Sequence, residues 1–329
     1  MPDPLLYVQA MVSAACVSAL CLLAMVAKRR TAGEAWLNSA CVPGIGLGLA
    51  VGYYVLSLHL AWPPANSLDR FLMIVLPVAL GIELLAGFPC VPSWGAWCLR
   101  IGLAATMPRI LLHSSVYLSG YDSDWPVWRT NAAMAVCAAL LMGVWALLAL
   151  LSKRSPGVSI SFALCLTIQC AGLTVMMAGY IKGGAAALPL VATLMATTIT
   201  ARLIAKRSVA VANCCTLAIP GIGVVGLFGL LFIGCFFGRL STGTALTMLL
   251  APLLCWLTEI PLLRHRQPWQ VGSFRLVLVA VPLAVVLGLA KRDFDRDMVP
   301  LLGMDLRPPS AITAQVGGTP SEIQPIALR

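Results

Sequence analysis

Two glutamate–arginine combinations are the residues best suited to do chemistry inside apolar parts of this sequence. Glu83 is followed 17 residues later by Arg100, and Glu259 is followed 16 residues later by Arg275. On antiparallel helices joined by a short loop, residues at this spacing can meet, so we expect two intramembrane Glu–Arg ion pairs. Pairing lowers the cost of burying either charge. Each pair could be a structural clasp, a proton or ion relay through the glutamate, or an arginine that extends to the membrane surface.

Arg109 and His113 indicate a second kind of site. They are one helical turn apart and share one face of a helix. No carboxylate is expected at their depth in the membrane, and an unpaired guanidinium facing a water-filled cavity suits an anionic ligand. These two residues are therefore our ligand-binding candidates, for a small anionic solute or a lipid headgroup. The alternative is that Arg109 reaches the acidic residues of the outer loops or the membrane interface.

Other chemistry has little support in the sequence. There are three histidines and no HExxH metal motif, no GxSxG nucleophile motif and no CxxC pair. Most of the 12 cysteines fall within apolar runs, where they act as small packing residues. We therefore assign no catalytic residue, no metal ligand and no cofactor, and an enzyme is possible but unsupported.

The composition explains why these charged residues are so few. The 329-residue chain is 60% hydrophobic and 10% charged, whereas soluble domains are about 45–50% apolar and about 25% charged. A soluble protein could not hide so much apolar surface. The net charge of +10 is spread in short clusters between apolar runs, which is typical of membrane orientation and not of nucleic-acid binding. The sequence predicts an all-α, polytopic membrane protein in contact with the lipid bilayer.

Ten segments approach the roughly 20 apolar residues that a membrane-spanning helix needs. Basic residues are concentrated in alternate loops, which places both termini outside the cytoplasm, in the cell (inner) membrane, by the positive-inside rule. The predicted segments are residues 5–27, 41–60, 71–87, 94–118, 131–151, 158–180, 185–204, 209–237, 242–263 and 274–290.

An internal duplication relates the two ends of the chain. Five features recur in the same order at offsets of 174 to 177 residues. Six helices separate the copies, an even number, so both copies share one orientation and form a parallel repeat. The matches are the basic pairs at 29–30 and 206–207, PGIG at 43–46 and 220–223, Glu83 with Glu259, Arg100 with Arg275, and Pro108 with Pro282.

The duplication predicts four regions. Residues 1–120 and 185–290 form the two four-helix repeats, 121–184 form a linking helical hairpin, and 291–329 form a disordered external tail, because the tail lacks a periodic apolar pattern. Within the first repeat, Gly44, Gly48 and Gly52 are spaced by four residues, which favours close approach of a second helix. A Pro-Gly break that exposes the backbone to a substrate is the alternative.

These features favour a permease or binding protein for a small anionic solute or lipid, with Arg109 and His113 at the ligand and the Glu–Arg pairs as supports. The alternative is a non-catalytic membrane scaffold or assembly subunit, in which the buried charges only fasten helices together. The sequence does not indicate a protein partner or an oligomeric state.

Overall fold

The computed structural model describes residues 4–28, 34–58, 62–88, 90–115, 118, 127–155, 157–207, 217–259 and 268–298. All regular structure in these residues is helical, which confirms the all-α class. The chain divides into two units, Met1–Lys291 and Arg292–Arg329. In the second unit, residues 292–298 are helical, and the rest of the predicted tail lies outside the described residues.

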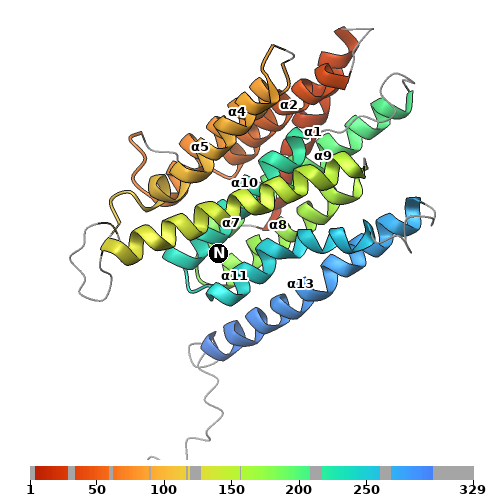
Figure 1. Cartoon of the computed structure of the whole chain (residues 1–329). Coiled ribbons are helices and arrows are strands. Elements are labelled where there is room, and N and C mark those ends of the chain that lie inside the picture. Colours follow the sequence, from red (N-terminus) through yellow and green to blue (C-terminus); the bar gives the residue numbers. More distant parts are fainter. Residues whose placement is uncertain are drawn as a thin grey trace, which may run out of the picture. The chain divides into compact units, whose positions relative to one another are not determined.

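Each of the ten predicted segments is helical over most of its described part (Figure 1). The helices often begin or end beyond the apolar run, because backbone hydrogen bonding continues into the polar flanks. The elements are α1 (Pro4–Lys28), α2 (Glu34–Val55), α3 (Ser67–Arg70), the π-helix η1 (Phe71–Val75), α4 (Leu76–Ala86), α5 (Ser93–Leu112), α7 (Val127–Arg154), α8 (Ser159–Met177), α9 (Ile181–Arg207), α10 (Ala218–Phe237), α11 (Thr242–Leu250), the 3₁₀-helix η3 (Ala251–Glu259) and α13 (Pro268–Met298).

Seven helices in the described part of the chain are long and apolar enough to cross a membrane. This indicates a multi-pass membrane protein. The other three predicted spans, over α2, α3–η1–α4 and α5, are not among the seven, so the count of ten spans and their orientation stay predictions. The seven are Pro4–Ala27, Val127–Arg154, Ser159–Met177, Ile181–Lys206, Ala218–Phe237, Thr242–Glu259 and Trp269–Arg296.

Helix α10 is the most buried helix of the first unit. Every residue from Ala218 to Gly234 is buried, and α10 contacts α2, α4, α7, α8, α9 and α11 (Figure 1). A helix that is apolar on all sides is typical of such a central position. Glycines on α10 leave room for large side chains: a Cβ added at Gly229 would overlap the Phe71 ring, and one added at Gly226 would lie 2.5 Å from Leu190.

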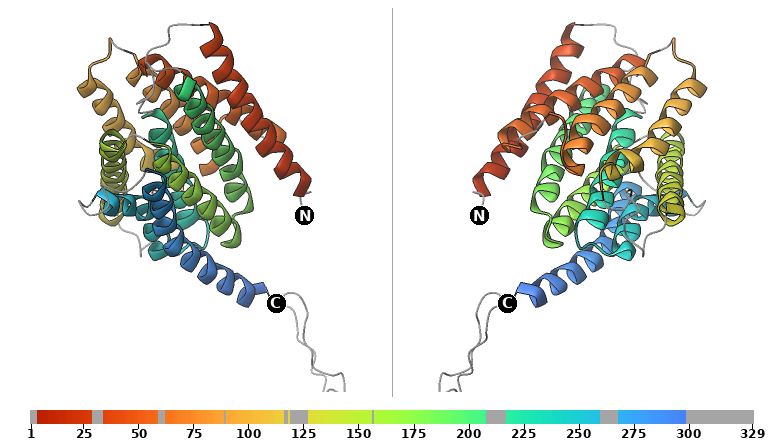
Figure 2. Two further views of the ribbon diagram at one scale, coloured as in Figure 1. Left: turned by 90° about the vertical axis from the view of Figure 1, so that its right-hand side faces the viewer. Right: turned by 90° about the vertical axis from the view of Figure 1, so that its left-hand side faces the viewer.

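The predicted glycine stripe of α2 lies against α1 and α9. A Cβ added at Gly48 would lie 2.6 Å from Thr193 Cγ2 and 2.7 Å from the Ala14 carbonyl oxygen, and one added at Gly52 would lie 2.6 Å from Pro189. Gly44 is close to the Ser18 carbonyl oxygen in the same way, at 3.2 Å. These glycines therefore sit at a close three-helix contact. Helices α1 and α7 lie at opposite margins of the first unit (Figure 2).

The change from α11 to η3 matters for the position of Glu259. Pro252 has no backbone N–H and cannot continue the α-helical hydrogen bonding. The chain tightens there into a 3₁₀-helix of nine residues, longer than the three or four that are usual. The end of η3 carries Thr258 and Glu259 to the start of α13, where Arg275 lies.

Candidate functional site

The structure brings Glu83 of α4 and Arg100 of α5 together as a closed ion pair. Arg100 Nε donates to Glu83 Oε1 at 2.9 Å, and Nη2 donates to Oε2 at 2.8 Å. This two-bond geometry is the strong form of a charge-assisted contact. Glu83 is fully buried and Arg100 is 7% exposed. Both charges therefore neutralise each other away from water.

Aromatic rings and a glycine enclose this first pair. The Arg100 guanidinium lies 5.0 Å from the centre of the Trp97 ring and 5.7 Å from that of Trp145, within the range of cation–π attraction. On the other side, Glu83 lies against Gly221 of α10. None of the cavities described below includes either charged residue. This environment suits a structural contact between α4, α5, α7 and α10.

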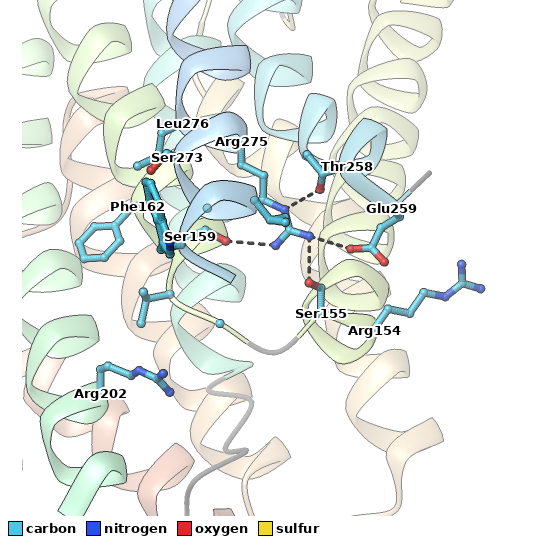
Figure 3. A pocket seen from close by; sticks show the side chains of 15 residues that line it. Arg154, Ser155, Ser159, Phe162, Arg202, Thr258, Glu259, Ser273, Arg275 and Leu276 are labelled. Atoms are coloured by element: carbon cyan, nitrogen blue, oxygen red, sulfur yellow. Dashed lines mark hydrogen bonds and ion pairs between the residues drawn. The ribbon is translucent and has the colours of Figure 1, made fainter. Parts of the chain in front are cut away.

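The second pair, Glu259 and Arg275, is open. Arg275 Nη2 donates to Glu259 Oε1 at 2.7 Å, and the Glu259 side chain is 24% exposed. Arg275 itself is buried, and three hydroxyl groups complete its surroundings (Figure 3): Thr258 accepts from Nε at 2.7 Å, Ser159 from Nη1 at 3.1 Å and Ser155 from Nη2 at 2.9 Å. Among the described residues, Arg275 has four side-chain acceptors, and Glu259 is the one that carries a negative charge.

A cavity of about 650 Å³ adjoins Arg275. It is formed by the ends of α7, α9 and η3, the start of α8 and the first turns of α13. Its lining includes three arginines, Arg154, Arg202 and Arg275, and one carboxylate, Glu259. The cavity is therefore positively charged. The N-terminus of α8, which begins at Ser159, adds to the positive potential through its backbone N–H groups.

The three arginines of the cavity are held differently. Arg275 is fixed by its four hydrogen bonds, whereas Arg154 is exposed and extends away from Arg275 (Figure 3). The Arg154 guanidinium lies 5.4 Å from the centre of the Trp256 ring. Arg202 is exposed and lies across the cavity from Glu259 (Figure 3). Arg202 is thus the arginine best placed to follow a ligand, and Arg275 provides a fixed charge.

Two serines can add neutral donors to the cavity. The hydroxyl oxygens of Ser155 and Ser159 both accept from Arg275. A hydroxyl has one O–H donor besides its acceptor lone pairs. Because the oxygens act as acceptors, the O–H groups remain to donate to a ligand in the cavity. A buried arginine, an exposed arginine and hydroxyl donors together suit an oxyanion such as a phosphate.

Arg109 and His113, the ligand candidates from the sequence, lie elsewhere. Both are exposed on or just after α5 and line none of the three cavities described here. His113 follows the last residue of α5, and its backbone carbonyl accepts from Arg70 Nη1, while its ring nitrogen Nδ1 bonds the Ser114 hydroxyl at 2.9 Å. An anion site at Arg109 and His113 therefore stays a prediction.

Sequence reasoning missed Arg154, Arg202, Ser155, Ser159 and Thr258 as parts of one site. They come from four separate segments of the chain, and nothing in their local pattern links them. The one available signal was the four-residue spacing of Ser155 and Ser159 across the loop that follows Arg154. Among the residues with a described placement, no group of three His, Cys, Asp or Glu could hold a metal ion.

The seven long apolar helices indicate a multi-pass helical membrane protein. No family model matches this chain, and neither a curated protein nor a solved structure does.

Proposed function

We propose that this membrane protein binds a small anionic solute or the anionic headgroup of a lipid in the cavity beside Arg275. The observation that carries this proposal is the cavity itself, lined by three arginines and one glutamate. Three of the four acceptors of buried Arg275 are neutral hydroxyls, so its positive charge is only partly compensated and attracts an anion into the cavity. An oxyanion there would meet two hydroxyl donors, an exposed arginine and a helix N-terminus.

Orientation is part of the same proposal. The cavity lies at the helix ends that carry Arg154, Arg202 and Lys206. By the positive-inside rule this end faces the cytoplasm, and both termini of the chain lie outside it. An anion would then enter from the cytoplasmic side or from the cytoplasmic leaflet. The parallel duplication of residues 1–120 and 185–290 also stays a proposal, supported by the similar positions of the two Glu–Arg pairs.

The binding proposal is tested by heating the purified 329-residue chain in detergent with phosphate, sulfate or chloride at constant ionic strength. A ligand that binds only the folded state raises the unfolding temperature. We expect phosphate to stabilise the chain and Arg202→Ala to weaken phosphate binding by about tenfold, as is typical for loss of one charge-assisted contact. No phosphate effect beyond that of chloride would contradict the proposal.

Two further arginine variants make this test specific. Arg129→Ala removes an exposed arginine near the start of α7, at the opposite end of that helix from Arg154, and is the matched control. We expect it to leave phosphate stabilisation unchanged. Arg109→Ala separates the two anion sites under consideration. If Arg109→Ala abolishes the effect and Arg202→Ala does not, the ligand binds at Arg109 and His113 instead.

The second candidate function is a membrane scaffold or assembly subunit. The closed Glu83–Arg100 pair favours it, because that pair is buried and joins α4 to α5 through two hydrogen bonds. A scaffold of this kind should show no ligand stabilisation with any anion and should co-purify with a partner protein from membranes. The phosphate experiment therefore separates the two functions.

A further inference from the structure

An apolar groove begins where the arginine cavity ends. The groove has a volume of about 450 Å³ and is lined by α8, α9 and α13. Its polar content is small, with Gln169 as the one amide side chain of the lining. Phe162 and Leu276 line both the groove and the cavity. The two spaces are therefore neighbours that share a wall, and Figure 3 shows both side chains beside Ser273.

The groove follows α8 away from the charged end. Ser159, which bonds Arg275, and Gln169, which lines the groove, are ten residues apart on α8. At 1.5 Å per residue, this separation corresponds to about 15 Å along the helix axis. The combined site thus has a cationic end near the proposed membrane surface and an apolar part that extends about half a hydrocarbon layer deeper.

Helix α13 forms one wall of the groove and carries exposed apolar side chains. Its Phe274 and Val277 side chains are exposed, and in a membrane they would contact the bilayer. Within an apolar stretch of 18 residues in α13, 22% is buried. The Arg275 hydrogen bonds to α8, η3 and Ser155 hold the first turns of α13 in place. A guest can therefore reach the groove laterally, from the bilayer.

We propose that the occupant is an anionic phospholipid, with its phosphate in the arginine cavity and one acyl chain in the groove between α8, α9 and α13. This inference rests on the proposed anion binding and names its ligand class. Charge complementarity selects the headgroup, because the lining of the cavity has a surplus of arginine. The adjoining apolar groove selects a ligand with a hydrocarbon chain over a free phosphate.

The test compares three probes on the delipidated 329-residue chain in detergent: inorganic phosphate, a short-chain phosphatidylglycerol and the phosphatidylcholine of the same chain length. Binding is measured by native mass spectrometry and by thermal shift. We expect phosphatidylglycerol to bind at least about tenfold more tightly than either other probe, since each buried methylene adds to affinity and the net charge adds to it separately.

A variant that fills the groove tests whether the acyl chain binds there. Ala280→Trp places a large ring in the groove, while Val281→Trp places the same ring on an exposed position of α13 that does not line it. We expect Ala280→Trp to reduce phosphatidylglycerol affinity to that of inorganic phosphate without changing phosphate affinity, and Val281→Trp to change neither. Met195→Trp, from the α9 wall, repeats the test if Ala280→Trp does not fold.

The outcomes distinguish failure of the lipid inference from failure of the proposed anion binding. If phosphate binds but phosphatidylglycerol binds no better, or if both groove variants leave its affinity unchanged, the lipid inference is wrong and anion binding stands. Equal binding of phosphatidylcholine overturns the headgroup assignment. If the wild-type protein binds neither phosphate nor phosphatidylglycerol, both proposals are wrong.

Discussion

Glu83 occupies the space that a side chain at Gly221 would need. A Cβ added at Gly221 would lie 2.5 Å from Glu83 Oε1, the same oxygen that accepts from Arg100 Nε at 2.9 Å. The carboxylate is thus fixed between a helix backbone and a guanidinium. This contact joins the central helix α10 to the α4–α5 hairpin, and it depends on the absence of a side chain in the second PGIG tetrapeptide.

Gly221→Ala should therefore destabilise the fold by about 1–3 kcal/mol, the usual cost of overpacking a tight contact. The Glu83 carboxylate cannot move aside without losing a bond to Arg100. Gly81→Ala is the matched control on α4, because a Cβ there meets nothing within 4 Å. Unfolding of both variants in detergent measures the difference, and equal stabilities would contradict the tight contact.

The Glu83–Arg100 pair should behave as a coupled unit. Arg100→Gln alone should cost about 3–5 kcal/mol, because it leaves a carboxylate buried without its partner. The double variant Glu83→Gln/Arg100→Gln should cost less than the sum of the single variants, since it removes both charges. Folded yield and unfolding free energy give the comparison. Additive costs, or a double variant no better than Glu83→Gln alone, would speak against a pair.

Substitution in the open Glu259–Arg275 pair should change anion binding, whereas substitution in the closed Glu83–Arg100 pair should not. Glu259→Gln removes the one carboxylate that lines the cavity and competes with a ligand for Arg275. We expect this variant to bind phosphate about tenfold more tightly than wild type, equivalent to ~1.4 kcal/mol. Glu83→Gln is the control, because its site is closed to solvent, and phosphate should not raise the unfolding temperature of this variant. If phosphate raised the unfolding temperatures of both variants equally, the cause would be a general effect of salt.

The α1–α2–α9 contact gives a prediction about packing alone. Gly48→Ala should destabilise the chain by about 1–3 kcal/mol, because its Cβ would collide with the Ala14 carbonyl oxygen and Thr193. Gly46→Ala, two residues away on α2, meets only Leu80 Cδ1 at 3.4 Å and should cost less than about 1 kcal/mol. Thermal unfolding of the two variants side by side is the measurement. A larger loss for Gly46→Ala would place the stripe on the wrong face.

Two glycines with free space around them allow cysteine substitutions that test the orientation of the protein in the membrane. A Cβ at Gly157, before α8, or at Gly243, in the first turn of α11, meets nothing within 4 Å. With an impermeant thiol reagent and peptide mapping, Gly243→Cys should be labelled in intact cells, and Gly157→Cys only after the membrane is opened. The reverse order would invert the orientation, and labelling of both from one side would change the number of spans between them.

The sequence by itself determined the class of fold and where the unusual residues lie. Hydropathy and helical spacing depend on neighbours along the chain, so they predict apolar helices and the positions of Glu83, Arg100, Glu259 and Arg275 within them. They also predict the glycine stripe of α2. The predicted duplication made the two Glu–Arg pairs look equivalent, because it compares only residue types and their offsets.

Only the tertiary structure decided which charges are enclosed and which face a cavity. Trp145 and Gly221 come from distant helices and close around the first pair. At the second pair, Ser155 comes from the loop after α7, Ser159 from α8 and Arg202 from α9, and they line a cavity of about 650 Å³. Burial and cavities arise from the packing of helices far apart in sequence, so the local pattern that predicted both pairs carried no information about their difference.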